Sequence, residues 1–263
     1  KYYVQYRYGS DNDTLQQAWQ IFLQTVYRSF SELDGLPENI FCARPAWNIQ
    51  HVSAFGKRKR NYDTALFAGA AKVFLSTHSS MSESNTWLID AIDFSRQVLA
   101  NKADVIYGQL ESAYTQEDSI QFKRKANEFL NLILVDDSLL SLNKNFRLDS
   151  WLNAAQALGG TAHEKEIFEK NARQQISFWG SDDPATNLHE YANKDWSGLL
   201  NSLYLPRWKM FIDQAYRNLR RQPHLSINYF SFEKDWVSKR NTFPGAIHID
   251  SKELFLKRVL SQY

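Results

Sequence analysis

The sequence predicts an all-α protein, folded as a multi-helix, bundle-like array in a single domain spanning residues 1–263. Apolar side chains recur at i, i+3 and i+4 along most of the chain, which is the period of an amphipathic helix. No stretch shows the alternation of a strand, and 10 Gly and 6 Pro are too few for an all-β chain of many turns. A chain of this length buries roughly three quarters of its unfolded surface, enough for a core without disulfides.

The first quarter of the chain predicts two helices and a long loop. Tyr2 to Tyr8 has helical spacing that Gly9 ends, and a second helix begins at a capping residue among 11–13. Residues 31–61 break the period with glycines and prolines, and we interpret them as a long irregular loop. The basic run at 57–60 inside it is more typical of a solvated loop tip than of a phosphate-binding or nuclear-targeting patch.

The middle of the chain predicts a series of helices with recognisable starts. The longest carries two apolar seams, which suggests burial on more than one side. Thr161 and Glu164 have the spacing of a capping box. In chain order, the helices are expected after Asp63, from Ser84 to Tyr114, across Phe122–Ile133, after Asp149 and after Thr161.

The last third predicts a long helix from about Tyr191 to Leu219 that is interrupted by Pro206. A proline inside a helix frees the carbonyl four residues earlier, so we expect a kink there or a junction of two helices. Further helices are expected at 230–239 and 250–262, the second opened by a capping box at Asp250 and Glu253.

Composition excludes several classes of function. Thirty-one basic residues against 29 acidic ones leave a net charge of +2, too little for a nucleic-acid-binding domain. No apolar run approaches the roughly 20 residues that cross a bilayer, so we expect no membrane partner. Cys42 is the only cysteine, and the six histidines lack the spacing of a zinc motif. We therefore expect neither a metal site nor a cofactor.

The most informative stretch runs from Trp179 to Trp208 and contains three tryptophans, the block Tyr191-Ala-Asn-Lys, and Pro-Arg-Trp. Taken singly, each tryptophan is more often a partly buried core residue. The alternative is a sugar-facing wall, because pyranose rings present apolar C–H faces that stack on indole and phenol rings. Trp179 precedes Gly180 and a polar turn, which places it near a loop, where binding residues tend to lie.

In this order, the Trp-Gly, Tyr-Ala-Asn-Lys and Pro-Arg-Trp motifs resemble the C-terminal helical domain of the α-N-acetylglucosaminidases, glycoside hydrolase family 89. The segments Tyr6–Gly9, Phe41–Pro45 and Asn171–Arg173 extend the resemblance to essentially all 263 residues. It is strongest from Phe168 to Phe211. Between Gly180 and Tyr191 this chain is a few residues longer than animal members of the family.

The resemblance implies a retaining glycoside hydrolase that removes terminal α-linked N-acetylglucosamine through a glycosyl-enzyme intermediate. The catalytic carboxylates would lie in a barrel domain preceding residue 1, and this chain would form one wall of the cleft between the two domains. Trp179 and Tyr191 match positions that line the sugar pocket, Leu188 is a third candidate, and Arg44 would make an interdomain contact. The implied partners are that barrel and an N-acetylglucosamine-terminated glycan, in a secreted, periplasmic or lysosomal enzyme.

No catalytic residue is expected within this chain. Glycoside hydrolysis needs two acids that face each other about 5 Å apart for retention and farther apart for inversion. Asp136–Asp137 and Asp182–Asp183 are sequence neighbours, which point apart on a helix or in a turn, so we interpret both pairs as solvated. The isolated chain is therefore predicted to be inactive.

Two other interpretations remain open at this point. The chain could be a free-standing helical carbohydrate-binding module, or a helical interaction scaffold whose aromatic side chains all belong to the core. A domain that packs on a barrel should also carry an exposed apolar patch, which we expect around Cys42–Ala54 and near Trp179.

Overall fold

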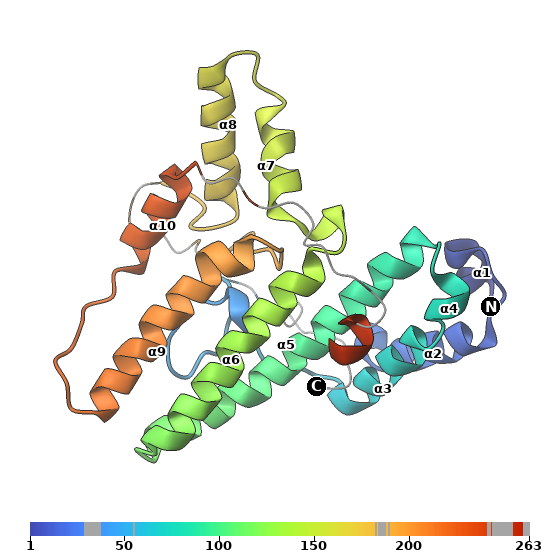
Figure 1. The fold of residues 1–263 in the computed structure, drawn as a ribbon, viewed down its shortest axis with the longest axis horizontal. Helices are drawn as coiled ribbons and strands as arrows, with labels where there is room; N and C mark the ends of the chain where they lie inside the picture. Colours follow the sequence, from blue (N-terminus) through green and yellow to red (C-terminus); the bar gives the residue numbers. More distant parts are fainter. Residues whose placement is uncertain are drawn as a thin grey trace.

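The computed structural model describes residues 1–28, 38–54, 56–181, 183, 188, 190–240, 243 and 255–259. Within these ranges the chain is helical and forms no strand beyond two isolated bridges. The prediction of an all-α array is therefore confirmed. Figure 1 shows a central group of long helices with smaller helices at two of its ends.

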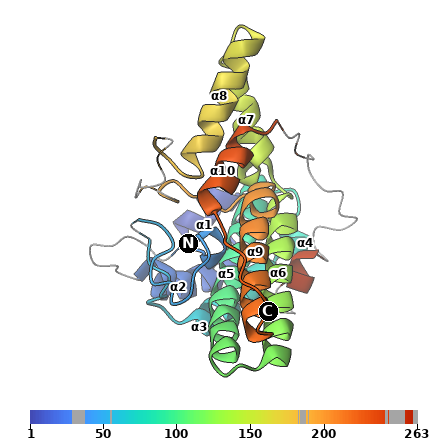
Figure 2. The ribbon, with the colours of Figure 1, turned by 90° about the vertical axis from the view of Figure 1, so that its left-hand side faces the viewer.

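The central group consists of α5 (Asn85–Thr115), α6 (Ser119–Leu140) and α9 (Leu205–Leu219) (Figures 1 and 2). The first two form an antiparallel hairpin that packs along much of its length, and α9 lies against α6. Both hairpin helices begin at a side-chain cap, the first at Ser84, where the sequence predicts its start. The Ser84 hydroxyl accepts from the Trp87 amide at 3.3 Å, and the Asp118 carboxylate accepts from two amides of α6.

The N-terminal helices pack around one end of α5. They are α1 (Tyr2–Tyr8), α2 (Asp13–Gln24), the 3-10 turn η1 (Val26–Arg28), α3 (Thr64–Leu75) and α4 (His78–Met81). Gly9 ends α1 in the left-handed conformation, with φ 70°, and Asn12 caps α2, as the sequence predicts. Phe22 and Phe94 stack at 4.0 Å between ring centroids and join α2 to α5.

Between η1 and α3, the described part of the irregular segment packs into the core of the molecule. Among its described residues, only η2 (Ile40–Cys42) is regular. Cys42, Ala43, Ile49 and Val52 are buried, and the Trp208 indole donates to the carbonyl of η2 residue 41 at 3.0 Å. The expected exposed apolar patch at 42–54 is therefore wrong, because this chain's own helices cover the segment.

A second helical hairpin projects from the body (Figures 1 and 2). It follows η3 (Lys144–Phe146) and consists of α7 (Leu148–Gln156) and α8 (Ala162–Gln175), with α10 (Tyr229–Ser238) against α8. The capping box of Thr161 and Glu164 is confirmed at the start of α8. Asp149 does not cap α7 as predicted, since that helix already begins at Leu148.

The helix expected from Tyr191 begins later than predicted. Residues 190–198 are irregular, and the helical backbone starts with a π-helical turn, η4 (Leu200–Tyr204), that continues directly into α9. The Asp137 carboxylate fixes this start by accepting from the Gly198 amide at 2.7 Å and the Asn201 amide at 3.2 Å. Pro206 lies in the first turn of α9, so the predicted junction of two helices is confirmed. The capping box at Asp250 lies outside the described residues.

Candidate functional site

Trp179 and Tyr191 lie side by side at the surface, although twelve positions separate them in sequence. Their ring centroids are 5.3 Å apart with an interplanar angle of 58°. Tyr191 is 45% exposed, Leu188 is 37% exposed, and Trp179 is partly buried. We call these three residues the Trp179–Tyr191 surface. It contains every binding residue expected from the sequence, and near Trp179 it also supplies the expected exposed apolar side chains.

The backbone after α8 brings these residues together. The Trp179 amide donates back to the Gln174 carbonyl at 3.0 Å, and Trp179 itself has a positive φ of 28°. On the other side, the Glu190 amide donates to the Ser177 carbonyl at 3.1 Å. The Tyr191 amide then bonds the Leu188 carbonyl at 3.2 Å in a tight turn. The backbone at Ser177, just before Trp179, is therefore hydrogen-bonded to the backbone at Glu190, just before Tyr191.

The other two tryptophans of this stretch pack inward. Trp208 is completely buried beside the ring of Phe129, 4.7 Å away. Trp196 packs on Trp151 at 5.8 Å. The core interpretation is therefore right for Trp208, whereas Trp179 presents its ring at the surface.

A network of four charges, three of them buried, adjoins the Trp179–Tyr191 surface. We call its members the Arg207 network: Arg44, Glu190, Arg207 and Glu233. Arg207 is completely buried, and its Nη1 donates to Glu190 and, at 2.7 Å, to Glu233. Its Nη2 donates to the Cys42 carbonyl at 2.9 Å. Arg44 pairs with the other oxygen of Glu233 at 2.5 Å. Two positive and two negative groups balance, which is what permits charges to be buried.

The electrostatics of this network indicate a structural role rather than a catalytic one. Burial raises the pKa of Glu190, and the charge of Arg207 opposes that rise. Burial lowers the pKa of Arg207, but the two glutamates outweigh this effect and raise it overall. Both carboxylates are inaccessible and engaged by arginine, so neither can act as a general acid or base on a bound substrate. Arg44, expected at an interdomain contact, has its ion pair within this chain.

A separate cluster of acidic side chains, Asp136, Asp137 and Asp195, joins α6 to the segment before η4. Asp136 is completely buried and Asp137 is 7% exposed, so the solvated interpretation of this pair is wrong. Burial and then the facing charge of Asp195 raise the pKa of Asp136 well above its ordinary value. Asp195 accepts from the Asn39 side chain at 2.7 Å, and burial raises its pKa as well. Of the other predicted pair, Asp183 is exposed and 182 lies outside the described residues.

Helical spacing contains a signal for two of the buried charges that the sequence analysis missed. Asp136 lies three positions after Ile133 and seven after Phe129, both buried on the same face of α6. Arg207 lies four positions after Leu203 on the inward face. Glu190 has no such signal, because it lies in irregular backbone with φ 59°.

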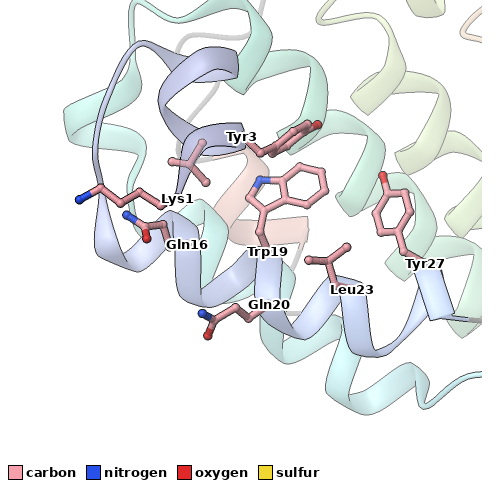
Figure 3. Close-up of a pocket in the computed structure, with 8 residues that line it drawn as sticks. Lys1, Tyr3, Gln16, Trp19, Gln20, Leu23 and Tyr27 are labelled. Atoms are coloured by element: carbon pink, nitrogen blue, oxygen red, sulfur yellow. The ribbon is translucent and has the colours of Figure 1, made fainter.

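An apolar cleft lined by described residues lies elsewhere, between α1 and α2. Figure 3 shows Tyr3, Trp19, Leu23 and Tyr27 around this cleft of about 350 Å³. Behind its Trp19 ring, the indole donates to the Tyr8 hydroxyl at 2.9 Å, and that hydroxyl donates to Asp90, the partner of Arg7. Among the described residues, no group of three or more His, Cys, Asp and Glu side chains is arranged to hold a metal ion. Across the same ranges, every helix is too short or too polar to cross a bilayer.

Comparison with known sequences matches the chain to one family over nearly its whole length. The family model of the α-N-acetylglucosaminidase C-terminal domain matches residues 1–259. Human α-N-acetylglucosaminidase is 26% identical over 98% of this chain. The chain spans about a third of that relative, 34% of its length.

Solved structures of family 89 glycoside hydrolase from Clostridium perfringens have the same fold as this chain. The enzyme in complex with PUGNAc superimposes with a TM-score of 0.92 and 30% identity, covering 99% of this chain and 31% of the other. A variant with two glutamates replaced by glutamine, in complex with its substrate GlcNAc-α-1,4-galactose, gives a TM-score of 0.91 at 29% identity. It covers 98% of this chain and 30% of the other.

Proposed function

The chain belongs to the family of α-N-acetylglucosaminidase C-terminal domains, and we propose that it is the helical domain of a retaining exo-α-N-acetylglucosaminidase. The observation that carries the proposal is the fold match over 99% of the chain to a family 89 glycoside hydrolase in complex with PUGNAc. The relatives extend well beyond the matched third. We place the two catalytic carboxylates in that remainder, in a barrel domain of the same polypeptide.

In this proposal, the Trp179–Tyr191 surface is one wall of the sugar-binding cleft. The two rings pack against each other with their centroids 5.3 Å apart and their planes inclined by 58°. Aromatic rings of this kind suit the C–H face of a pyranose, and Leu188 adds exposed apolar area. Binding should also cost little conformational entropy at these two residues, because hydrogen bonds already fix their backbone. The substrate is a glycan ending in α-linked N-acetylglucosamine, and the enzyme works in a secreted, periplasmic or lysosomal setting.

Kinetics of the full-length polypeptide that carries this chain test the proposal. With an aryl α-N-acetylglucosaminide as substrate, Trp179→Ala and Tyr191→Ala should each lower kcat/KM by about tenfold or more, the loss of one transition-state contact. Trp151→Ala is the matched control, since this tryptophan is also at the surface, 36% exposed, but lies on α7. Equal kinetics for all three variants would refute the assignment of the wall.

A second experiment tests the division of labour between the domains. The 263-residue chain alone should not hydrolyse the aryl glycoside. Among the described residues, the carboxylates that lie close together, in the Arg207 network and around Asp136, are buried and cannot reach a substrate. Turnover that persists after host glycosidases have been excluded would place the catalytic acids in this chain and overturn that part of the proposal.

A further inference from the structure

We infer that Glu190 is a positioning residue for the Trp179–Tyr191 surface: its ion pair with Arg207 holds the backbone that presents Tyr191 to the sugar. This inference rests on the proposed function, because it assigns a task to a residue that touches no substrate. Leu188 and Tyr191 are exposed on either side of Glu190, which is itself buried. The segment therefore turns one side chain inward between two that face outward.

The backbone conformation of Glu190 needs stabilising contacts from the rest of the fold. Its φ of 59° lies in the left-handed region, which is unfavourable for a residue with a Cβ. Such a conformation persists only where the surroundings impose it. The Glu190 amide donates to Ser177, and its carbonyl accepts from the backbone and side-chain nitrogens of Asn193 at 3.0 and 2.9 Å. The carboxylate adds the bond from Arg207.

Arg207 is a rigid anchor because it is bonded to two other parts of the fold. Its guanidinium reaches Glu233 on α10 and the carbonyls of Cys42 and Ala43 at the end of η2. It also lies over the Tyr204 ring, 5.0 Å from the centroid. Arginine suits such a site because its planar fork serves several acceptors at once. A shift of Glu190 would have to break this arrangement or abandon its charge partner.

The geometry links this anchor to the surface in one step along the chain. Tyr191 follows Glu190 directly, so a rotation about the Glu190 backbone moves the phenol ring away from Trp179. A misplacement of about 1 Å at a binding group can cost orders of magnitude in rate. Loss of the anchor should therefore weaken binding of the sugar even where the domain stays folded.

The test uses the full-length polypeptide and measures KM, kcat and the inhibition constant of 2-acetamido-1,2-dideoxynojirimycin. Glu190→Gln retains an acceptor for Arg207 without the charge, and Glu190→Ala removes both. The matched control is Asp90→Asn, near the start of α5, which also removes the charge of a buried carboxylate that pairs with an arginine, here Arg7 of α1. Thermal unfolding of each variant reports the loss of stability separately from the loss of affinity.

We expect the inhibition constant to rise by about tenfold in Glu190→Ala and by less in Glu190→Gln, at a temperature where every variant is folded. Asp90→Asn should lower the melting temperature yet keep the inhibition constant of the wild type. If the Glu190 variants lose stability but bind as tightly as Asp90→Asn, the positioning role is wrong. If Glu190→Ala fails to fold, Glu190→Gln decides the question by the same criterion.

Variants of the surface itself separate this inference from the proposed function. Trp179→Ala and Tyr191→Ala should raise the inhibition constant. Should they leave it unchanged, the substrate wall is wrong and the inference falls with it. Should they raise it while both Glu190 variants bind normally, only the positioning role fails.

Discussion

The segment from Glu190 to Asp195 is held at its two ends by buried carboxylates, but the two ends use different chemistry. Glu190 pairs with Arg207, in a network where two arginines balance two glutamates. Asp195 instead faces the carboxyl group of Asp136 on α6. The first end is held by opposite charges, whereas at the second end burial and the facing carboxyl group favour a bound proton on Asp136.

This difference separates a carboxylate bonded to a cation from a carboxylate that faces another acid. At the Glu190 end, each buried carboxylate has a cation within hydrogen-bonding distance. At the Asp195 end, the charge of Arg96 on α5 only opposes the raised pKa, and the Asn39 amide is the described hydrogen-bond donor to Asp195. Burial raises a carboxyl pKa at both ends, and at the Glu190 end an arginine hydrogen-bonded to the carboxylate opposes that rise.

Removal of the cation should have the largest effect. Arg207→Met leaves Glu190 and Glu233 buried without their shared partner and should cost about 3–5 kcal/mol of unfolding free energy. Denaturant unfolding of the 263-residue chain, followed by circular dichroism, measures this loss. Arg220→Met, at the exposed end of the same helix, is the control and should change stability by less than about 0.5 kcal/mol. A loss below 1 kcal/mol for Arg207→Met would mean that the network contributes little.

The pH dependence of stability should distinguish the two ends next. A carboxyl whose pKa is higher in the folded chain takes up a proton on folding, so its contribution to stability falls as pH rises above the ordinary value of 3.8. The slope is at most about 1.4 kcal/mol per pH unit for one group, up to the folded pKa. Asp136→Asn supplies a permanent donor to Asp195 and should remove the contribution of Asp136 to this slope, while the other buried carboxyls with raised pKa values keep theirs.

Unfolding of the wild type and of Asp136→Asn between pH 5 and 8 measures the effect. The wild type should lose stability relative to the variant as pH rises. Parallel curves would show that the two acids do not share a proton.

The middle of the segment should contribute less than either end. The Asn193 side chain donates to Glu38 and to the Glu190 carbonyl, both at 2.9 Å. Asn193→Ala should cost about 0.5–1.5 kcal/mol, the net value of ordinary hydrogen bonds. A cost as large as that of Arg207→Met would mean that the loop is held by its centre rather than by its ends.

The exposed ring of Tyr191 should contribute least to stability. With 45% of its surface exposed, Tyr191→Ala should lower the unfolding free energy by less than about 1 kcal/mol. Trp208→Ala, which empties a fully buried site, should cost about 3–5 kcal/mol in the same assay. Similar losses for the two variants would place Tyr191 in the core and remove it from the proposed wall.

Periodicity and capping chemistry made most of the helical framework predictable, whereas the site depends on features with no local signal. Asn12, Asp63 and Thr161 cap helices where the sequence indicates starts. The sequence did not predict that residues 190–198 are irregular, because the start of the helix after them depends on Asp137, 61 to 64 positions away in sequence. Glu190 was missed for the same reason: its partner is chosen by tertiary packing, and its positive φ cannot be read from residue type.

The most direct test of the account is a crystal structure of the full-length protein with 2-acetamido-1,2-dideoxynojirimycin. The account predicts that the sugar ring lies within van der Waals distance, about 4 Å, of the Trp179 and Tyr191 side chains. It also predicts that Glu190 remains bonded to Arg207 beneath them. A ligand bound without contact to either ring would contradict the central claim.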